Sequence, residues 1–129
     1  MRIEELSERR RYRRFRLRQP AFVVFDADPP KLREVLDIGM SGLAVSFVDD
    51  HAELREGTSR LTLISRIRGH QPEEDLGGLP CRIVSERAMD EFPPSRIHRR
   101  RCGIELVDLT PGQRQKLAGF ILAHADEEV

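Results

Sequence analysis

The sequence has few of the residues that build catalytic or metal centres. Its two cysteines, Cys81 and Cys102, form no CxxC pair and lack partners for a zinc set or a disulfide framework, so buried reduced thiols are expected. The four histidines fall in separate predicted elements without metal-ligand spacing. The segment from Gly39 to Leu43 lacks the last glycine of a GxSxG nucleophile elbow. We therefore expect a protein that is not an enzyme and that holds no metal or cofactor.

Long apolar runs and net charge are also missing. No window approaches the roughly 18 apolar residues of a membrane span, and an arginine run rather than an apolar stretch follows the first six residues. We therefore expect a cytoplasmic protein without membrane insertion. The 22 basic and 22 acidic side chains cancel, so any binding charge must be local. Twenty of the basic residues are arginine, which favours bidentate recognition of phosphate, although a GC-rich genome produces the same bias.

The length of 129 residues matches one domain. The first 18 residues carry eight arginines against three glutamates and show no core-forming periodicity. We expect residues 1–14 to form a flexible arginine-rich arm and residues 15–129 to form a single domain. Because the arm contributes little to the core, removing one of its side chains should leave the fold intact.

Short alternating or apolar segments between glycine, proline and polar residues predict a mainly β protein. We predict strands at 15–25, 31–38, 43–48, 60–68, 79–87 and 99–107, with a charged loop at 69–78. A helix is predicted at about 111–125, capped by Thr110, with one apolar face for docking on the sheet, followed by a solvated tail at 126–128. This order predicts a six-stranded antiparallel β-barrel with a C-terminal α-helix.

Two polar features are candidates for a binding site. In the cluster Arg9–Arg14, guanidinium groups can hold phosphates bidentately and stack on purine rings, and Asp37 at a strand end can accept the N1 and N2 donors of guanine. Taken alone, the cluster is equally typical of a solvated tail or a nonspecific nucleic-acid arm, and the segment 37–42 is typical of a hairpin turn. A second basic run, 96–101, is typical of an edge-strand charge pattern, with a phosphate or partner contact as the alternative.

In this order and spacing, the two features resemble the PilZ family. Its first motif, RxxxR, matches the segment from Arg10 to Arg14, within the longer local form at 8–14. Its second motif, (D/N)xSxxG, matches at Asp37 and Gly42. Residues 101–121 also resemble the last strand and closing helix of the family, a split-barrel type of fold, so that the likeness runs from residue 8 to about residue 124.

The resemblance implies a site for cyclic di-GMP, which family members often bind as a self-stacked dimer. By this resemblance, Arg10 and Arg14 would hold phosphates and stack on guanine, with Arg9 as a helper. Asp37 would bind a guanine edge, and Gly42 would permit close backbone approach. Glycine stands at the motif's serine position, and the next serine lies two residues away. The implied ligand-binding residues are thus Arg9, Arg10, Arg14, Asp37, Gly39, Ser41 and Gly42.

The resemblance also implies a function by binding. In the first hypothesis, cyclic di-GMP orders the arm, and this switch relays the signal to an unidentified effector protein in motility, adhesion, biofilm or exopolysaccharide control. In the second, the chain is a PilZ-like adaptor that has lost the nucleotide because of Gly39 and acts only through protein–protein interaction; restoring serine there would separate the two. A nucleic-acid module using the arm is the weakest alternative, and steep salt dependence would identify it.

Overall fold

The computed structural model describes residues 13–26, 30–48, 58–68, 71–88 and 99–129. Its elements are β1 (Arg14–Leu17), β2 (Phe22–Phe25), β3 (Lys31–Gly39), β4 (Gly42–Val48), β5 (Thr58–Arg68), β6 (Gln71–Ala88), β7 (Arg99–Leu106), α1 (Pro111–His124) and β8 (Ala125–Glu128). All strand pairings among them are antiparallel.

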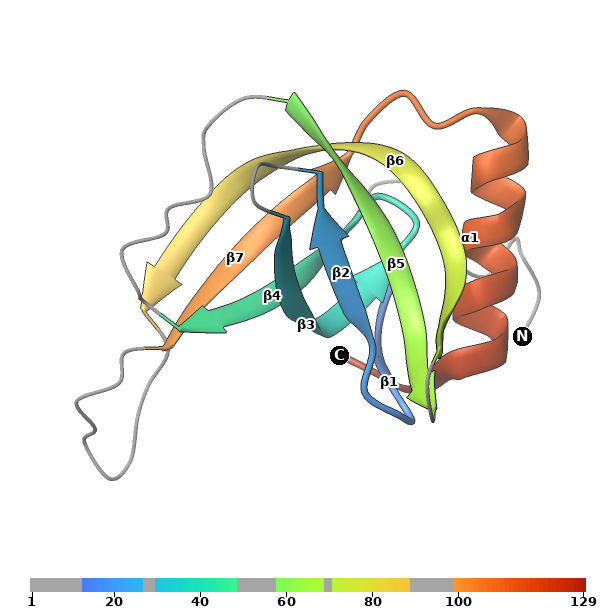
Figure 1. Ribbon diagram of the computed structural model, residues 1–129, viewed down its shortest axis with the longest axis horizontal. Helices are drawn as coiled ribbons and strands as arrows, with labels where there is room; N and C mark the ends of the chain where they lie inside the picture. The colour runs from blue at the N-terminus through green and yellow to red at the C-terminus, as the bar shows by residue number, and fades with distance from the viewer. Residues whose placement is uncertain (1–12, 27–29, 49–57, 69–70, 89–98) are drawn as a thin grey trace.

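Six of the strands close into a barrel. Their order is β2, β5, β6, β7, β4 and β3, and pairing between β3 and β2 closes the ring. The long strand β3 shares one edge between two partners: β2 pairs with residues 31–34 and β1 pairs with residues 38–39. Strand β8 pairs with the outer side of β1. The predicted six-stranded antiparallel barrel with one C-terminal helix is confirmed (Figure 1).

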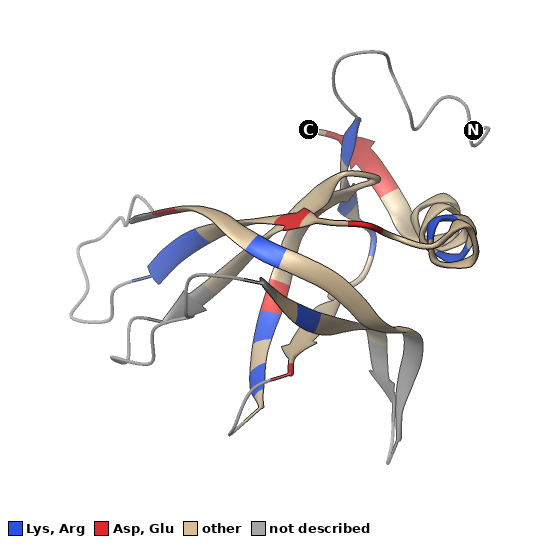
Figure 2. Cartoon of the chain, turned by 90° about the horizontal axis from the view of Figure 1, so that it is seen from above, with Lys and Arg blue, Asp and Glu red and all other residues tan. Residues whose placement is uncertain are grey.

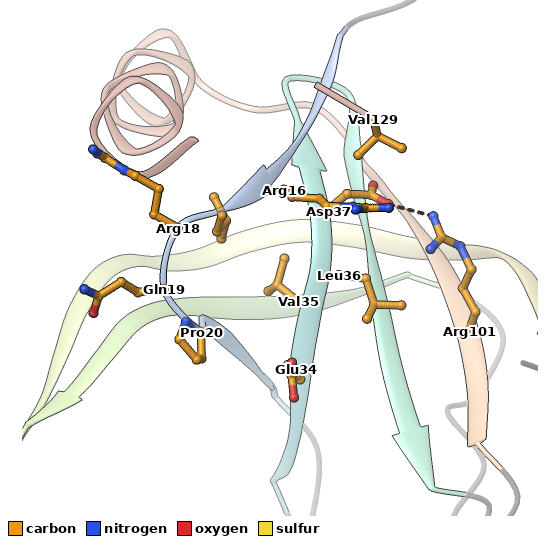
Figure 3. Close-up of a pocket in the computed structure, with 11 residues that line it drawn as sticks. Arg16, Arg18, Gln19, Pro20, Glu34, Val35, Leu36, Asp37, Arg101 and Val129 are labelled. Atoms are coloured by element: carbon orange, nitrogen blue, oxygen red, sulfur yellow. Dashed lines mark hydrogen bonds and ion pairs between the residues drawn. The ribbon is translucent and has the colours of Figure 1, made fainter. Parts of the chain in front are cut away.

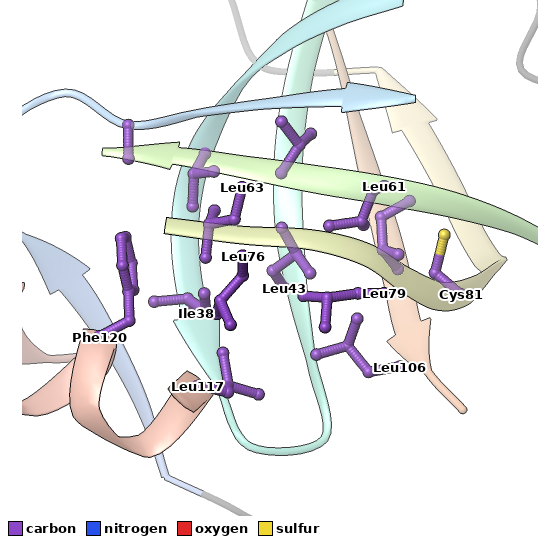
Figure 4. Packing of buried hydrophobic residues seen from close by; sticks show 14 of the residues in the cluster. Ile38, Leu43, Leu61, Leu63, Leu76, Leu79, Cys81, Leu106, Leu117 and Phe120 are labelled. Atoms are coloured by element: carbon purple, nitrogen blue, oxygen red, sulfur yellow. The ribbon is translucent and has the colours of Figure 1, made fainter. Parts of the chain in front are cut away.

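Alternation along the strands separates the barrel core from its outer face. In β4, the side chains of Leu43 and Val45 are fully buried in the core, so Ala44 and Ser46 between and beyond them face outward. Aliphatic residues of all six barrel strands meet inside the barrel (Figure 4). Burial of this apolar surface supplies the main stabilisation of the fold.

The helix packs on the barrel through its apolar face. A capping box begins it: Gln113 N donates to Thr110 Oγ1 at 3.1 Å, and Thr110 N donates to Gln113 Oε1 at 3.0 Å. Leu117 and Phe120 are buried against residues of the barrel core (Figure 4), and the ring of His124 lies 4.6 Å from that of Phe120. The helix ends at His124, one residue before its predicted end.

Two predicted segments differ from the structure near the N-terminal part of the barrel. The strand expected at 15–25 is divided into β1 and β2, because the chain turns at 18–21, where Pro20 has no N–H to donate to a ladder. The expected arm at 1–14 lies outside the described residues except for Arg13 and Arg14. Arg14 begins β1, and the next residue, Phe15, is buried in the core. The sheet therefore includes Arg14, the last residue of the expected arm.

Two segments predicted to be irregular are strands. Most of the loop expected at 69–78 belongs to β6, whose backbone pairs with β5 through several register shifts; Gly78 takes a φ of 65° there. The solvated tail expected at 126–128 is β8, which pairs with β1 although its side chains remain exposed. Both predictions were wrong because they relied on the charged side chains of these segments. Strand pairing uses backbone N–H and C=O groups, which charged residues also have.

Candidate functional site

A β-bulge places Asp37 on the outer face of the barrel. Val35 lies opposite Val45, but the next pair is Asp37 with Ala44, so Leu36 is an extra residue on β3. Without the bulge, Asp37 would share the inward face of Val35. Residues directly opposite in an antiparallel pair share a face, so Asp37 lies on the outer face with Ala44.

Two arginines from different strands hold this aspartate. Arg14 Nη1 of β1 donates to Oδ1 at 3.1 Å, and Arg101 Nη2 of β7 donates to Oδ2 at 2.7 Å (Figure 3 shows the second contact). The side chain of Asp37 is 3% exposed, whereas those of Arg14 and Arg101 are 35% and 30% exposed. A buried carboxylate is tolerated only when it is paired, so Asp37 anchors both guanidinium groups at the surface.

The strand register explains why Arg101 reaches Asp37. Arg101 lies opposite Ser46 on β4, while Asp37 lies opposite Ala44, two residues earlier on the same outer face. The two residues therefore lie on either side of β4, and the long arginine side chain spans that strand to reach the carboxylate. Sequence reasoning left Arg101 out of the site, because its contact depends on the β3–β4–β7 register, which local patterns do not reveal. The alternative weighed for the run at 96–101, a phosphate contact near the ligand, was the only signal of it.

An open groove of about 520 Å³ adjoins this cluster. Its lining comes from β1, the turn after it, β3, β7 and residue 129; it consists of Arg16, Leu17, Arg18, Gln19, Pro20, Glu34, Val35, Leu36, Asp37, Arg101 and Val129. Figure 3 shows Asp37, Arg16 and Arg101 close together at one side, while Arg18 extends toward the helix, where it donates to the carbonyl of Ala123. The groove therefore combines basic groups with a partly apolar floor, a combination suited to an anion that carries flat rings.

The two motif glycines are required by the packing of the chain itself. A Cβ on Gly39 would lie 2.5 Å from the backbone oxygen of Arg13, because β1 crosses close to β3 at this residue. A Cβ on Gly42 would lie 2.1 Å from the backbone oxygen of Ile104 on β7. The close backbone approach expected at Gly42 exists, but its partner is a neighbouring strand. Ser41 contributes its carbonyl, which accepts from the backbone N–H of Leu106 at 2.9 Å.

Five of the seven predicted site residues lie in the described part of the chain. Arg14, Asp37 and Gly39 meet where β1 crosses β3, Ser41 follows in the connection between β3 and β4, and Gly42 begins β4. Arg9 and Arg10 lie outside the described residues.

Within the described ranges, no helix is long and apolar enough to cross a membrane.

A sequence model of the PilZ domain family matches residues 8–123. The fold is similar to that of the PilZ domain with c-di-GMP of YcgR from Escherichia coli, with a TM-score of 0.67, 18% sequence identity, and coverage of 90% of this chain and 91% of that chain. None of the curated proteins searched matches this chain.

Two further solved structures share the fold. The inhibitor of motility MotI/DgrA from Bacillus subtilis has a TM-score of 0.59 and 19% identity, and the match covers 91% of this chain and 51% of that chain. MrkH, described as a c-di-GMP-dependent transcription regulatory factor, has a TM-score of 0.63 and 13% identity, with coverage of 88% and 50%. The chain therefore spans about half the length of these two proteins.

Proposed function

We propose that this chain, which belongs to the PilZ domain family, is a receptor for cyclic di-GMP that acts by binding rather than by catalysis. The observation that carries the proposal is the cluster of Arg14, Asp37 and Arg101 beside the groove. Its first two residues come from the two family motifs, and β-strand pairing brings them together although they are 23 positions apart. Similar domains, those of YcgR and PlzA from Borreliella burgdorferi, have been solved with c-di-GMP.

The arginines suit the phosphates of this ligand. Arg14 and Arg101 each keep about a third of the side chain exposed, and Arg16 lines the groove beside them. A guanidinium group offers five N–H donors in a planar fork, so one held by a carboxylate still presents an edge and a face. In this proposal, Arg14 contacts phosphate and stacks on a guanine, and Arg9 and Arg10 add further donors.

Asp37 has a different part in the unliganded chain from the one that the motif suggests. Both of its carboxylate oxygens accept from arginine. Each oxygen could accept a second bond, but the side chain is only 3% exposed, so a guanine edge can reach Asp37 only if one of the two arginines moves aside. In our proposal, the incoming base displaces Arg14 from Asp37 and releases its guanidinium group for the phosphates, while Arg101 keeps the carboxylate paired.

The signal would pass to a partner through residues 1–12. Strand β1 begins two positions after residue 12, and Asp37 holds Arg14 at its first position. Phosphate contacts from Arg9 and Arg10 would order this segment over the outer face of the barrel and change the surface that an effector protein meets. Control of motility, adhesion, biofilm or exopolysaccharide is the corresponding output.

One observation favours a second candidate, an adaptor without nucleotide. The position of the motif's serine is Gly39, where the backbone oxygen of Arg13 occupies the place of a side chain. A lost hydrogen bond to a charged ligand lowers affinity by about one to two decades. If the Kd for the ligand exceeds its cellular concentration, the site stays empty and the same surface would serve only protein–protein contacts.

Titration calorimetry of the protein with cyclic di-GMP tests the proposal, with cyclic di-AMP and GTP as controls. We expect saturable, guanine-selective binding and a stoichiometry that distinguishes one ligand from a stacked pair. Arg14→Ala should weaken binding by at least about tenfold, because it removes a charged donor. Absence of heat at high micromolar ligand would refute the receptor function and favour the adaptor.

A matched variant controls for the loss of an arginine elsewhere. Arg82 on β6 also pairs with a carboxylate, at 2.8 Å to Glu105, and it does not line the groove. Arg82→Ala should bind cyclic di-GMP as the wild type does. Both variants should keep an intact barrel, because Arg14→Ala leaves Asp37 with Arg101 as a partner. Thermal unfolding of both variants checks this expectation.

A further inference from the structure

An acidic strand lies against the strand that carries the site's arginines. In the pairing of β8 with β1, Glu128 is opposite Phe15 and Ala125 is opposite Leu17. Backbone bonds extend the ladder at both ends, from Val129 N to Arg14 O at 2.9 Å and from Arg18 N to His124 O at 3.0 Å. Figure 2 shows the acidic residues of β8 directly beside the basic residues of β1. Strand β1 is therefore held between β3 and β8.

Two carboxylates of β8 engage an arginine of β1 and the arginine that precedes this strand. Glu128 receives a bidentate pair of bonds from Arg13, with Nε to Oε1 at 3.0 Å and Nη2 to Oε2 at 2.6 Å. Glu127 accepts from Arg16 Nη1 at 2.9 Å. The hydrogen bond from Arg13 lowers the pKa of the Glu128 carboxyl, so this partner is fully ionised at neutral pH.

The same segment reaches the groove. Arg16 and Val129 both line it, and Figure 3 places them on the side of Asp37. Carboxylates and phosphates accept the same bidentate geometry from arginine. Glu127 thus occupies a guanidinium group of the groove, that of Arg16, with a bond that an anionic ligand could take, and Glu128 holds the nearby Arg13.

We propose that β8 is an internal competitor of the anionic ligand for Arg13 and Arg16, and this inference rests on the function proposed above. Binding of cyclic di-GMP then includes the cost of breaking the contacts of Glu127 and Glu128. Coupling between two binding events is reciprocal. If docking of β8 on β1 lowers the affinity for the ligand by some factor, the bound ligand lowers the equilibrium constant for docking of β8 by the same factor. The strand thereby sets the ligand concentration at which the receptor responds.

The test is the double variant Glu127→Gln with Glu128→Gln, which removes both charges and keeps the size of the side chains. Exposed ion pairs contribute little individually, so we expect cyclic di-GMP to bind about three- to tenfold more tightly. The control is Asp108→Asn with Asp126→Asn, which removes the same charge from two exposed residues outside these pairs. It should leave the affinity within about twofold.

The outcomes separate this inference from the receptor function. If the wild type binds and the double variant binds equally or more weakly, the competitor is refuted and the receptor function stands. If the control tightens as much as the double variant, general electrostatics account for the gain and the competitor is again refuted. If only the double variant binds, both proposals are supported, and if neither binds, both fail.

Hydrogen exchange of the wild type gives an independent measurement. Ligand should increase exchange at the amides of residues 125–129, since their ladder with β1 is weakened. Increased protection there would show that β8 helps to organise the site, contrary to the inference.

Discussion

Replacing Gly39 with serine completes the family motif on paper, but the structure predicts damage rather than repair. The Cβ of the new side chain would lie 2.5 Å from the backbone oxygen of Arg13 and 3.4 Å from Arg14 Cγ. Carbon and carbonyl oxygen normally approach to about 3.3–3.6 Å, so the space is short by about 0.8–1.1 Å. Because the obstacle is backbone, it can yield only if β1 lifts from β3, where Arg14 pairs with Gly39.

The expected cost follows from this displacement. Overpacking in a well-packed region destabilises by about 1–3 kcal/mol. For a domain of this size, that corresponds to a decrease in Tm of roughly 4–12 °C. Lifting β1 also moves Arg14 away from the place where it would meet the phosphates, so the affinity for cyclic di-GMP should fall, whereas a hydroxyl that bonded the ligand would raise it by about one to two decades.

Thermal unfolding and titration calorimetry of Gly39→Ser measure both quantities. Gly39→Ala adds the Cβ without the hydroxyl and should cost as much stability. Gly119→Ala is the control for adding a Cβ in open space: apart from the surrounding turns of its own helix, no atom lies within 4 Å, and a helical alanine should stabilise by about 0.5–1 kcal/mol. Wild-type stability of Gly39→Ser together with tighter binding would refute the reasoning, because β1 could not then be held over Gly39 in solution.

Three other predictions concern the framework. Thr110→Ala should lower the free energy of unfolding by about 1 kcal/mol in a urea titration, because the capping bonds with Gln113 are lost, while Thr110→Ser should not. Gly42→Ala should cost about 3 kcal/mol, because its Cβ would meet the backbone of β7, and a soluble variant of unchanged Tm would contradict this. Burial raises the pKa of both Cys81 and Cys102 from 9.0 to about 11, so the native state keeps thiol protons that the unfolded chain releases. Stability should therefore fall between pH 9 and 11, and a thiol reagent at pH 7 that labels the native protein as fast as the unfolded one would refute burial.

Local patterns predicted much of the fold. The barrel strands from β3 to β7, the helix and the connection at 39–42 follow from alternation, glycine positions and a capping residue, which act over a few neighbouring residues. The errors fell on segments whose pairing partner is distant. Strand β8 forms because β1 offers an unpaired backbone edge and arginines for its glutamates, and neither is visible in the residues 125–128.

The site divides in the same way. Local residue patterns supply the chemical groups: the arginines, the acidic residue Asp37 and two glycines at motif spacing. Their arrangement comes from the tertiary structure, because one extra residue in β3 turns Asp37 outward and the register of β7 brings Arg101 to it. The tertiary structure also decided that Gly39 accommodates the chain's own backbone. Side-chain direction in a sheet reverses with each one-residue shift of register, and register is set by all the strands together.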